Sequence, residues 1–330
     1  MKTLVIGCGS VGRRHAANAR KFGETAVFDV DRDLAARTAS ELGIESFANL
    51  EDALARSPSR AIVAVPNRLH IPLAEKAVAA GADVLIEKPV SHTTEGVGRF
   101  LDRAEASGRR VVVGCNMRFH KAVAALHENL AGIGRPFFAR AHVGNYLPNM
   151  RPGVDYRKLY CARREEGGGV ILDAIHEIDY LSWFFGPVER VTADAARLSD
   201  LEIDVEDYAC LGLRHASGPV SELHLDYLRP WKRRGCEIVG SQGMLLWQSE
   251  GKQPEICTVR LFQQDTGTWD ILLETDSLDV NQPYETMLSH FMEEPGGSEG
   301  SPLLGGREAL AELEVALQAL AAASSANTGR

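Results

Sequence analysis

The sequence predicts an α/β protein with a doubly wound parallel sheet in residues 1–119 and an α+β domain with an open, largely antiparallel sheet in residues 120–330. Three observations support this. Six strand–helix alternations fill the first 115 residues, a glycine-rich turn follows the first apolar run, and short turns join alternating strands in the second half. A length of 330 residues is enough for two such domains.

Composition narrows the class of protein. Hydrophobic residues make up 45% and charged residues 25%, as in ordinary soluble globular proteins. A net charge of −9 argues against a nucleic-acid-binding surface. No apolar run approaches the roughly 20 residues that span a bilayer, and we interpret the first residues as a strand and not as a signal peptide. Six scattered cysteines without a Cys-x-x-Cys motif predict reduced thiols, a cytoplasmic location and no metal site.

The first strand, Lys2–Ile6, runs into the motif Gly7-Cys8-Gly9-Ser10-Val11-Gly12, and a helical pattern continues from Val11 to Phe22. In such a motif the first glycine permits a tight turn, the second lets a pyrophosphate approach the backbone, and the third lets the helix pack closely on the strand. Ser10 and Val11 would open a helix whose N-terminal N–H groups face the phosphates. The motif therefore predicts a dinucleotide-binding domain of the Rossmann type.

The second strand, Thr25–Phe28, ends at Asp29, where such domains hold the ribose diol of the cofactor. A carboxylate there would repel a 2′-phosphate, so we expect NAD in preference to NADP. Asp31 is interpreted as the N-cap of a helix over Arg32–Leu42. Arg32 keeps NADP as the less favoured alternative.

The remaining elements of the first half follow in order. We expect strands at 44–47, 61–65, 84–86 and 110–114, and helices at 51–56, 69–80 and 94–107. Residues after these strands share the sheet edge that carries the glycine turn, where ligands bind in open α/β sheets. Those assigned to the cofactor are Pro66, Asn67, His70, Glu87, Lys88 and Asn116.

Lys88 has two interpretations. It follows a buried apolar run and precedes Pro89, which biases it toward an extended or turn geometry at the carboxyl end of a strand. It is either a solvated cation paired with Glu87 or a catalytic proton carrier.

The second half begins with a helix over 120–131, an alternating strand over 136–146, and a loop that carries Tyr156, Arg157 and Tyr160. A helical pattern then follows Gly167-Gly168-Gly169. Asp173 and His176 are three residues apart and so are expected on one helical face, either as a functional pair or as a local capping pair. Strands are expected at 188–198, 206–214, 220–227, 233–240, 244–248, 256–262 and 269–274, and helices at 284–293 and 304–323.

Assembled in this way, the chain resembles the Gfo/Idh/MocA family of dinucleotide-dependent oxidoreductases over nearly its full length. The resemblance rests on the glycine motif, Glu87-Lys88-Pro89, Asn116-x-Arg118-Phe119, and Gly167-Gly168-Gly169 with Asp173-x-x-His176-x-x-Asp179. It implies a Rossmann domain, a C-terminal domain whose open sheet mediates homodimers or homotetramers, and hydride transfer between nicotinamide and a ring carbon. It also implies that Lys88, Asp173 and His176 form the active site.

The expected chemistry is oxidation of a secondary alcohol, which requires a base for the hydroxyl proton. We assign that role to His176, polarisation of the oxygen to Lys88 and orientation of the substrate to Asp173. Lys88 and His176 could exchange roles.

The expected substrate is a sugar or a nucleotide sugar of bacterial surface-sugar biosynthesis. The residues assigned to it are Arg118, Tyr156, Arg157, Tyr160, Asp173 and His176. Arginines 151, 157, 163 and 229 could meet a diphosphate or carboxylate, although each alone is better interpreted as a surface residue. The alternatives are an inositol or other cyclitol, a non-sugar ring such as a tetrapyrrole or dihydrodiol, and a non-catalytic protein that senses NAD(H).

Overall fold

The computed structural model describes residues 2–252, 254–293 and 301–327 of the chain. Two compact units divide it: Met1–Asn116 with Asn281–Leu313, and Met117–Val280 with Glu314–Arg330. The sequence-based boundary between residues 119 and 120 lies close to the first of these divisions, but the structure returns residues 281–313 to the first unit. It does so because this segment supplies a helix and a short strand that contact elements of that unit.

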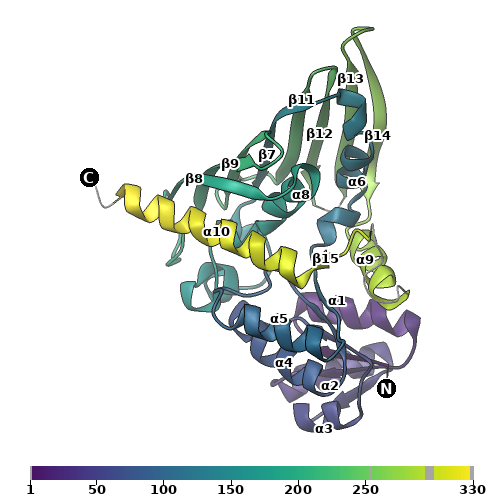
Figure 1. Cartoon of the computed structure of the whole chain (residues 1–330). Coiled ribbons are helices and arrows are strands. Elements are labelled where there is room, and N and C mark those ends of the chain that lie inside the picture. The colour runs from purple at the N-terminus through teal and green to yellow at the C-terminus, as the bar shows by residue number, and fades with distance from the viewer. Residues whose placement is uncertain (1, 253, 294–300, 328–330) are drawn as a thin grey trace. The chain divides into compact units, whose positions relative to one another are not determined.

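A seven-stranded sheet forms the centre of the first unit (Figure 1). Its order is β15–β6–β5–β4–β1–β2–β3, and neighbours are parallel except β15, which is antiparallel to β6. The six parallel strands thus follow the strand order of a dinucleotide-binding Rossmann sheet. Their bounds are β1 Thr3–Ile6, β2 Thr25–Phe28, β3 Glu45–Phe47, β4 Arg60–Val63, β5 Asp83–Ile86, β6 Val111–Val113 and β15 Leu304–Gly305.

Helices surround this sheet and bury its central strands. Val5, Ile62 and Leu85 have no exposed surface, as expected for strands that are covered on both faces. Helix α9 lies beside α1, where Asn18 and Asn281 exchange amide hydrogen bonds of 3.2 Å (Figure 1). The helix bounds are α1 Ser10–Ala19, α2 Arg32–Leu42, α3 Leu50–Ala55, α4 His70–Ala79, α5 Val97–Ala106 and α9 Gln282–Glu293.

The second unit contains an eight-stranded sheet in the order β14–β13–β12–β11–β7–β10–β9–β8. Neighbours are antiparallel except β7 and β10, which are parallel. The expectation of successive hairpins therefore fails between β10 and β11, because β7 lies between them. The bounds are β7 Pro136–Gly144, β8 Val188–Ala196, β9 Tyr208–His215, β10 Val220–Asp226, β11 Arg233–Gly240, β12 Gly243–Gly251, β13 Glu255–Gln263 and β14 Thr268–Leu278.

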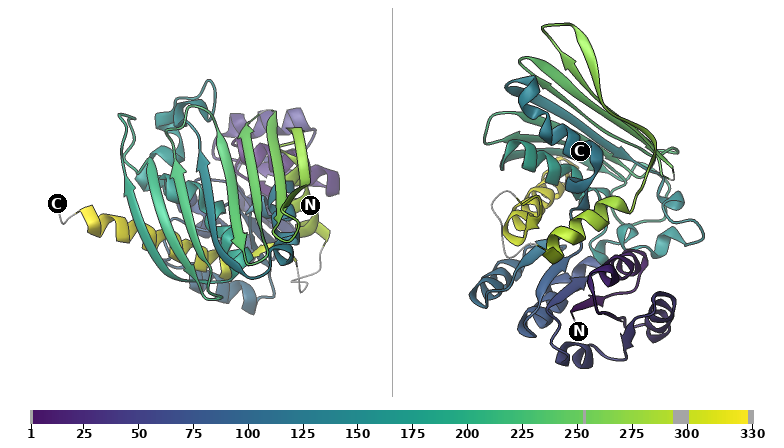
Figure 2. Two further views of the ribbon diagram at one scale, coloured as in Figure 1. Left: turned by 90° about the horizontal axis from the view of Figure 1, so that it is seen from above. Right: turned by 90° about the vertical axis from the view of Figure 1, so that its right-hand side faces the viewer.

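Helices cover one face of this sheet. α6 (Lys121–Glu128) contacts β12, β13 and β14, and α8 (Ile175–Phe185) contacts β7. The left view of Figure 2 shows the strands side by side from the opposite face, on which no described helix of this unit lies. That face carries polar pairs such as Arg140 with Glu222, whose side chains are 62% and 57% exposed.

The helix predicted through Asp173 and His176 is broken at Ala174. Helix α7 covers Val170–Asp173, Ala174 has φ −93° and ψ 27°, and α8 starts at Ile175. The hydrogen-bond spacing changes here. The Ala174 N–H donates to the carbonyl of Val170, four residues back, whereas the Glu177 N–H donates to the carbonyl of Ala174, three residues back, which makes a tighter turn. Asp173 thus ends one helix and His176 lies in the first turn of the next, so the predicted single helical face does not relate them.

The final helix also starts later than predicted. Leu304 and Gly305 form β15 and pair with Val113 and Val112, which satisfies the edge of β6, and α10 covers Gly306–Asn327. None of the helices in the described residues combines the length and hydrophobicity required to cross a bilayer.

Candidate functional site

The glycine turn between β1 and α1 has the shape that a pyrophosphate requires. Gly7 has φ +101°, which favours glycine, and a Cβ on Gly12 would lie 1.9 Å from the carbonyl oxygen of Gly7. Gly9, the N-cap of α1, has open space instead: no heavy atom lies within 4 Å of a Cβ built there. Ser10 and Val11 begin the helix at this open side. The turn is thus crowded at Gly7 and Gly12 and open at Gly9, where α1 begins. This arrangement fits the phosphates of a dinucleotide.

Asp29 lies at the end of β2 and is bonded to this turn. Its Oδ2 accepts a 2.6 Å hydrogen bond from the Cys8 N–H, and its Oδ1 accepts one of 2.9 Å from the Asp31 N–H. Each carboxylate oxygen retains acceptor capacity for a ribose hydroxyl. Burial, followed by the charge of Asp29, raises the pKa of Cys8 to about 11, so its thiol stays protonated.

Helix α2 confirms the prediction for Asp31, whose Oδ1 accepts from the Leu34 N–H at 3.0 Å as an N-cap. Arg32 follows at the exposed start of this helix. Asp29 and Arg32 thus remain the two residues that bear on the choice between NAD and NADP.

Lys88 is the only residue between Val84 and Ser91 that is not buried. Its N–H donates to Oε2 of Glu87 at 3.3 Å, and Oε1 of Glu87 lies 2.6 Å from Nε2 of His15 in α1. The Glu87 carboxylate is therefore bonded to the backbone of Lys88 and to a buried histidine. This geometry fixes the backbone of Lys88, which as a whole residue is half-buried.

The other residues assigned to the cofactor lie at the carboxyl ends of β4 and β6. Pro66 is exposed, whereas Asn67 and Asn116 are buried at the starts of the short helices Asn67–Leu69 and Asn116–Phe119. His70 is fully buried, and its Nδ1 and Nε2 lie 2.8 and 2.9 Å from the carbonyls of Pro89 and Val65.

Burial lowers the pKa of His70, which favours a neutral ring that donates to one of these carbonyls at a time. The structure thus directs both ring nitrogens of His70 at the protein backbone, and its assignment to the cofactor stays a prediction.

In the second unit, Asp173 is held by two tyrosines. The hydroxyl of Tyr160 donates to Oδ1 at 2.6 Å, and that of Tyr227 donates to Oδ2 at 3.3 Å. Burial, followed by the charge of Asp173, raises the pKa of Tyr227, so the phenol remains a donor. The two bonds fix the orientation of the carboxylate.

The glycine triplet before α7 makes room for another carboxylate. Gly169 has φ +109°, and a Cβ there would lie 2.3 Å from Oε1 of Glu206, which accepts from the Ile171 N–H at 3.1 Å. Glu206 therefore caps the start of α7, the helix that ends at Asp173.

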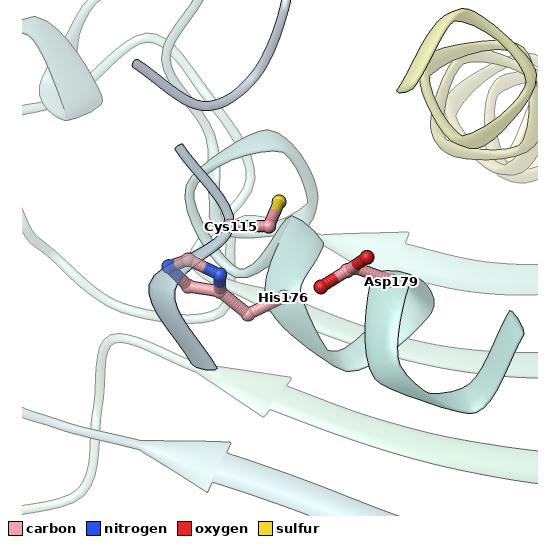
Figure 3. A group of neighbouring side chains, drawn as sticks. All are labelled: Cys115, His176 and Asp179. Carbon is pink, nitrogen blue, oxygen red and sulfur yellow. The ribbon is translucent and has the colours of Figure 1, made fainter. Parts of the chain in front are cut away.

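Two buried ion pairs anchor α8, the helix that carries His176. Nε of Arg118 lies 2.7 Å from Oδ1 of Asp179, with the side chains 4% and 0% exposed. Arg234 donates two hydrogen bonds, of 2.7 and 3.1 Å, to Glu177. Figure 3 shows His176 and Asp179, which both come from α8; the third labelled residue, Cys115, belongs to the first unit. Arg118, assigned to the substrate from sequence, is thus part of the buried support of this helix.

The loop residues assigned to the substrate are bonded within the second unit. Arg157 forms ion pairs with Asp155 at 2.8 Å and Glu202 at 3.0 Å, and the hydroxyl of Tyr156 accepts from the Glu202 N–H at 3.2 Å. Of the three loop residues assigned to the substrate, Tyr160 is the one that bonds to Asp173.

Sequence reasoning missed the contacts made by His15, Tyr227 and Glu206. His15 had a detectable signal, since His15 and Asn18 are the polar residues among those that α1 buries, the others being Gly12, Ala16 and Ala19. Tyr227 and Glu206 act on residues 54 and 35 positions away, and no local pattern records such contacts.

Comparisons with known proteins identify the family of the chain. Residues 1–115 match the model of an oxidoreductase family with an NAD-binding Rossmann fold, and residues 122–246 match the Gfo/Idh/MocA C-terminal domain. The chain belongs to the Gfo/Idh/MocA family. It is therefore an oxidoreductase with an NAD-binding domain, which confirms the fold and the enzyme class expected from the sequence.

Several Gfo/Idh/MocA relatives resemble this chain. The 1,5-anhydro-D-fructose reductase of Ensifer adhaerens is 30% identical over 332 residues, covering 97% of this chain and 95% of its own. The UDP-N-acetylglucosamine 3-dehydrogenase of Acidithiobacillus ferrooxidans is 34% identical over 142 residues, covering 43% and 44%. An oxidoreductase of Agrobacterium radiobacter, solved with NAD+, L-tartaric acid and magnesium, has a TM-score of 0.83 at 20% identity, covering 100% and 97%. This last likeness concerns the fold.

Proposed function

We propose that the chain transfers a hydride between NAD and a secondary alcohol or ketone carbon of a sugar or nucleotide sugar. The observation that carries this proposal is the Asp173 carboxylate, which two tyrosine hydroxyls hold directly before the helix of His176. Such a carboxylate suits a polyol, because it can accept from one hydroxyl of the ring while a neighbouring hydroxyl reacts. NAD held at the glycine turn and Asp29 would supply the hydride acceptor.

The roles follow from the residue types. Histidine, with an ordinary pKa of about 6.5, exchanges protons near neutrality, so His176 takes the hydroxyl proton. Lys88 polarises the same oxygen and helps to relay its proton, and Asp173 orients the ring. An exchange of roles between Lys88 and His176 leaves the reaction class unchanged.

Within the sugar class, the second unit favours an uncharged substrate. Arg157 is paired with Asp155 and Glu202, and Nη2 of Arg229 lies 3.4 Å from Asp226. To bind Arg157 or Arg229, the diphosphate of a nucleotide sugar would have to compete with the carboxylates that already pair with these guanidinium groups. The similarity to the anhydrofructose reductase over 97% of the chain supports the same preference.

A substrate panel tests the proposal. We expect turnover with 1,5-anhydro-D-fructose or another uncharged sugar, less with UDP-N-acetylglucosamine and least with myo-inositol, measured as the change in NADH absorbance. Turnover of inositol alone would reject the sugar assignment, and turnover of the UDP-sugar alone would reject the preference for an uncharged substrate. NADH binding without turnover of any compound would favour the NAD(H)-sensing alternative.

A second prediction concerns the cofactor. We expect NADH to bind at least about tenfold more tightly than NADPH, because the Asp29 carboxylate and a 2′-phosphate repel each other, and each 1.4 kcal/mol of repulsion is tenfold in affinity. Quenching of tryptophan emission in titrations with both cofactors measures the ratio. Asp29→Ser should reduce it. A preference for NADPH that disappears in Arg32→Ala would instead assign the selectivity to Arg32.

A further inference from the structure

Two fully buried histidines contact the residues on either side of Lys88: His15 contacts Glu87, and His70 contacts the carbonyl of Pro89. His15 has no role in the function proposed above. We propose that His15 is a positioning residue: through Glu87 it fixes Lys88 relative to α1, the helix that starts at the glycine turn. The proposal rests on the role proposed above for Lys88, and it adds the residue that sets where Lys88 stands.

The contacts form a short chain. Nε2 of His15 lies 2.6 Å from Oε1 of Glu87, and Oε2 of the same carboxylate accepts from the Lys88 N–H at 3.3 Å. Oε1 also lies close to the end of β6, where a Cβ on Gly114 would be 3.1 Å from it. The Glu87 carboxylate therefore lies between a histidine, a backbone amide and a strand, which leaves it little room to turn away from His15.

His15 is itself fixed by α9. Its ring contacts the ring of Tyr284 edge to face, with the ring centroids 5.7 Å apart. The Tyr284 ring is in turn covered by the guanidinium of Arg14, whose Cζ lies 4.6 Å from the ring centroid. Nδ1 of His15 has no hydrogen-bond partner among the described residues, so Glu87 is the polar contact that the ring makes there. An apolar side chain would fill this buried space without the cost of burying a polar ring. The bond to Glu87 thus distinguishes histidine from a packing residue.

The residue that follows Lys88 is held as well. The carbonyl of Pro89 lies 2.8 Å from Nδ1 of His70, and both histidines have no exposed surface. With bonds before and after it, Lys88 has a fixed backbone, so that its side chain starts from a defined position. Hydride and proton transfer require reacting groups that are aligned to a fraction of an ångström. The contacts of His15 in α1 with Glu87 set the position of Lys88 relative to the glycine turn, so their loss is expected to slow catalysis.

The experiment compares His15→Leu, which removes the bond, with His15→Gln, whose amide N–H can restore it. Asn18→Ala is the matched control, since Asn18 is a buried polar residue one turn further along the same helix and bonds to Asn281 instead. We expect His15→Leu to lower kcat on the sugar substrate at least about tenfold, with the NADH dissociation constant within about threefold of wild type. His15→Gln should recover most of kcat, and Asn18→Ala should keep it. Equal kcat in the leucine and glutamine variants, or a leucine variant within about twofold of wild type, would overturn the proposal.

A second readout needs no substrate. We expect the Lys88 amide to exchange hydrogen for deuterium at least about threefold faster in His15→Leu, and at the wild-type rate in His15→Gln and Asn18→Ala. Unchanged exchange in His15→Leu would overturn the proposal even if no sugar were turned over. Absence of sugar turnover in the wild-type protein would instead contradict the proposed function and leave this exchange test intact. If His15→Leu does not fold, Glu87→Gln carries the test: an amide has a single acceptor oxygen, so faster exchange at Lys88 and a lower kcat are expected, and wild-type values for both would overturn the proposal.

Discussion

Replacing His176 by alanine is expected to lower kcat on the sugar substrate by about 10²–10⁴-fold, and Lys88→Met is expected to have an effect of the same order. The reason is that each variant removes a group proposed to act on the proton of the reacting hydroxyl. Steady-state turnover with saturating NAD and sugar measures both. NADH titration should give a dissociation constant close to that of wild type for His176→Ala, because His176 lies outside the NAD-binding domain.

Two substitutions outside the proposed machinery serve as controls. His127→Ala removes a half-buried histidine that stacks on Trp183 at 3.8 Å, and Lys76→Met removes an exposed lysine paired with Glu51. Both should keep wild-type kcat. Near-wild-type turnover in both Lys88→Met and His176→Ala would show the assignment to be wrong.

The same variants separate the two roles. If His176 is the acid/base, one limb of the pH profile of kcat disappears in His176→Ala and persists in Lys88→Met. The reverse pattern would exchange the roles.

The first sheet could be predicted because its strands carry their own signal. Val84–Ile86, buried on both faces, is a continuous apolar run, and it forms β5 almost as expected. The glycine turn is equally easy to recognise, since its three glycines lie within six positions, although the atoms that exclude a Cβ at Gly7 belong to the distant residues Ala64 and Val65. The pairing of β15 with β6 and the place of β7 between β10 and β11 could not be predicted in this way, because pairing between distant strands leaves no mark in the pattern of either one.

The same distinction applies to the candidate site. The motifs singled out Lys88, Asp173 and His176 as candidates, but they gave no sign of the residues that hold them. His15 and Glu87 are 72 residues apart, and Tyr227 and Asp173 are 54 apart. The break at Ala174 was also invisible, because the apolar residues before and after it continue one helical spacing.

The interpretation of Arg118 makes the strongest prediction about stability. A substrate-binding arginine at a surface could be replaced at little cost in folding, whereas Arg118 is 5% exposed and bonds to Asp179, which has no exposed surface. We expect Arg118→Ala to lower the free energy of unfolding by about 3–5 kcal/mol, because it removes the cation beside a buried carboxylate. Urea denaturation followed by tryptophan fluorescence measures the change.

The matched control is Arg140→Ala on the open face of the sheet, where the ion pair with Glu222 has side chains 62% and 57% exposed. Its loss should cost less than about 1 kcal/mol. Equal effects of the two substitutions would contradict the view that Arg118 supports α8 from within the core.

A double variant separates support from substrate binding. Arg118→Leu with Asp179→Leu removes both charges, and replacing a buried ion pair by apolar side chains of similar volume is often neutral in stability. If Arg118 only supports α8, the double variant should recover most of the lost stability, and its KM for the sugar should stay near the wild-type value. If Arg118 also contacts the substrate, as its place in the Asn116-x-Arg118-Phe119 motif suggested, the double variant should be stable and yet show a raised KM. Measuring stability and KM in this one protein thus decides between the two assignments for Arg118, because each predicts a different combination of the two values.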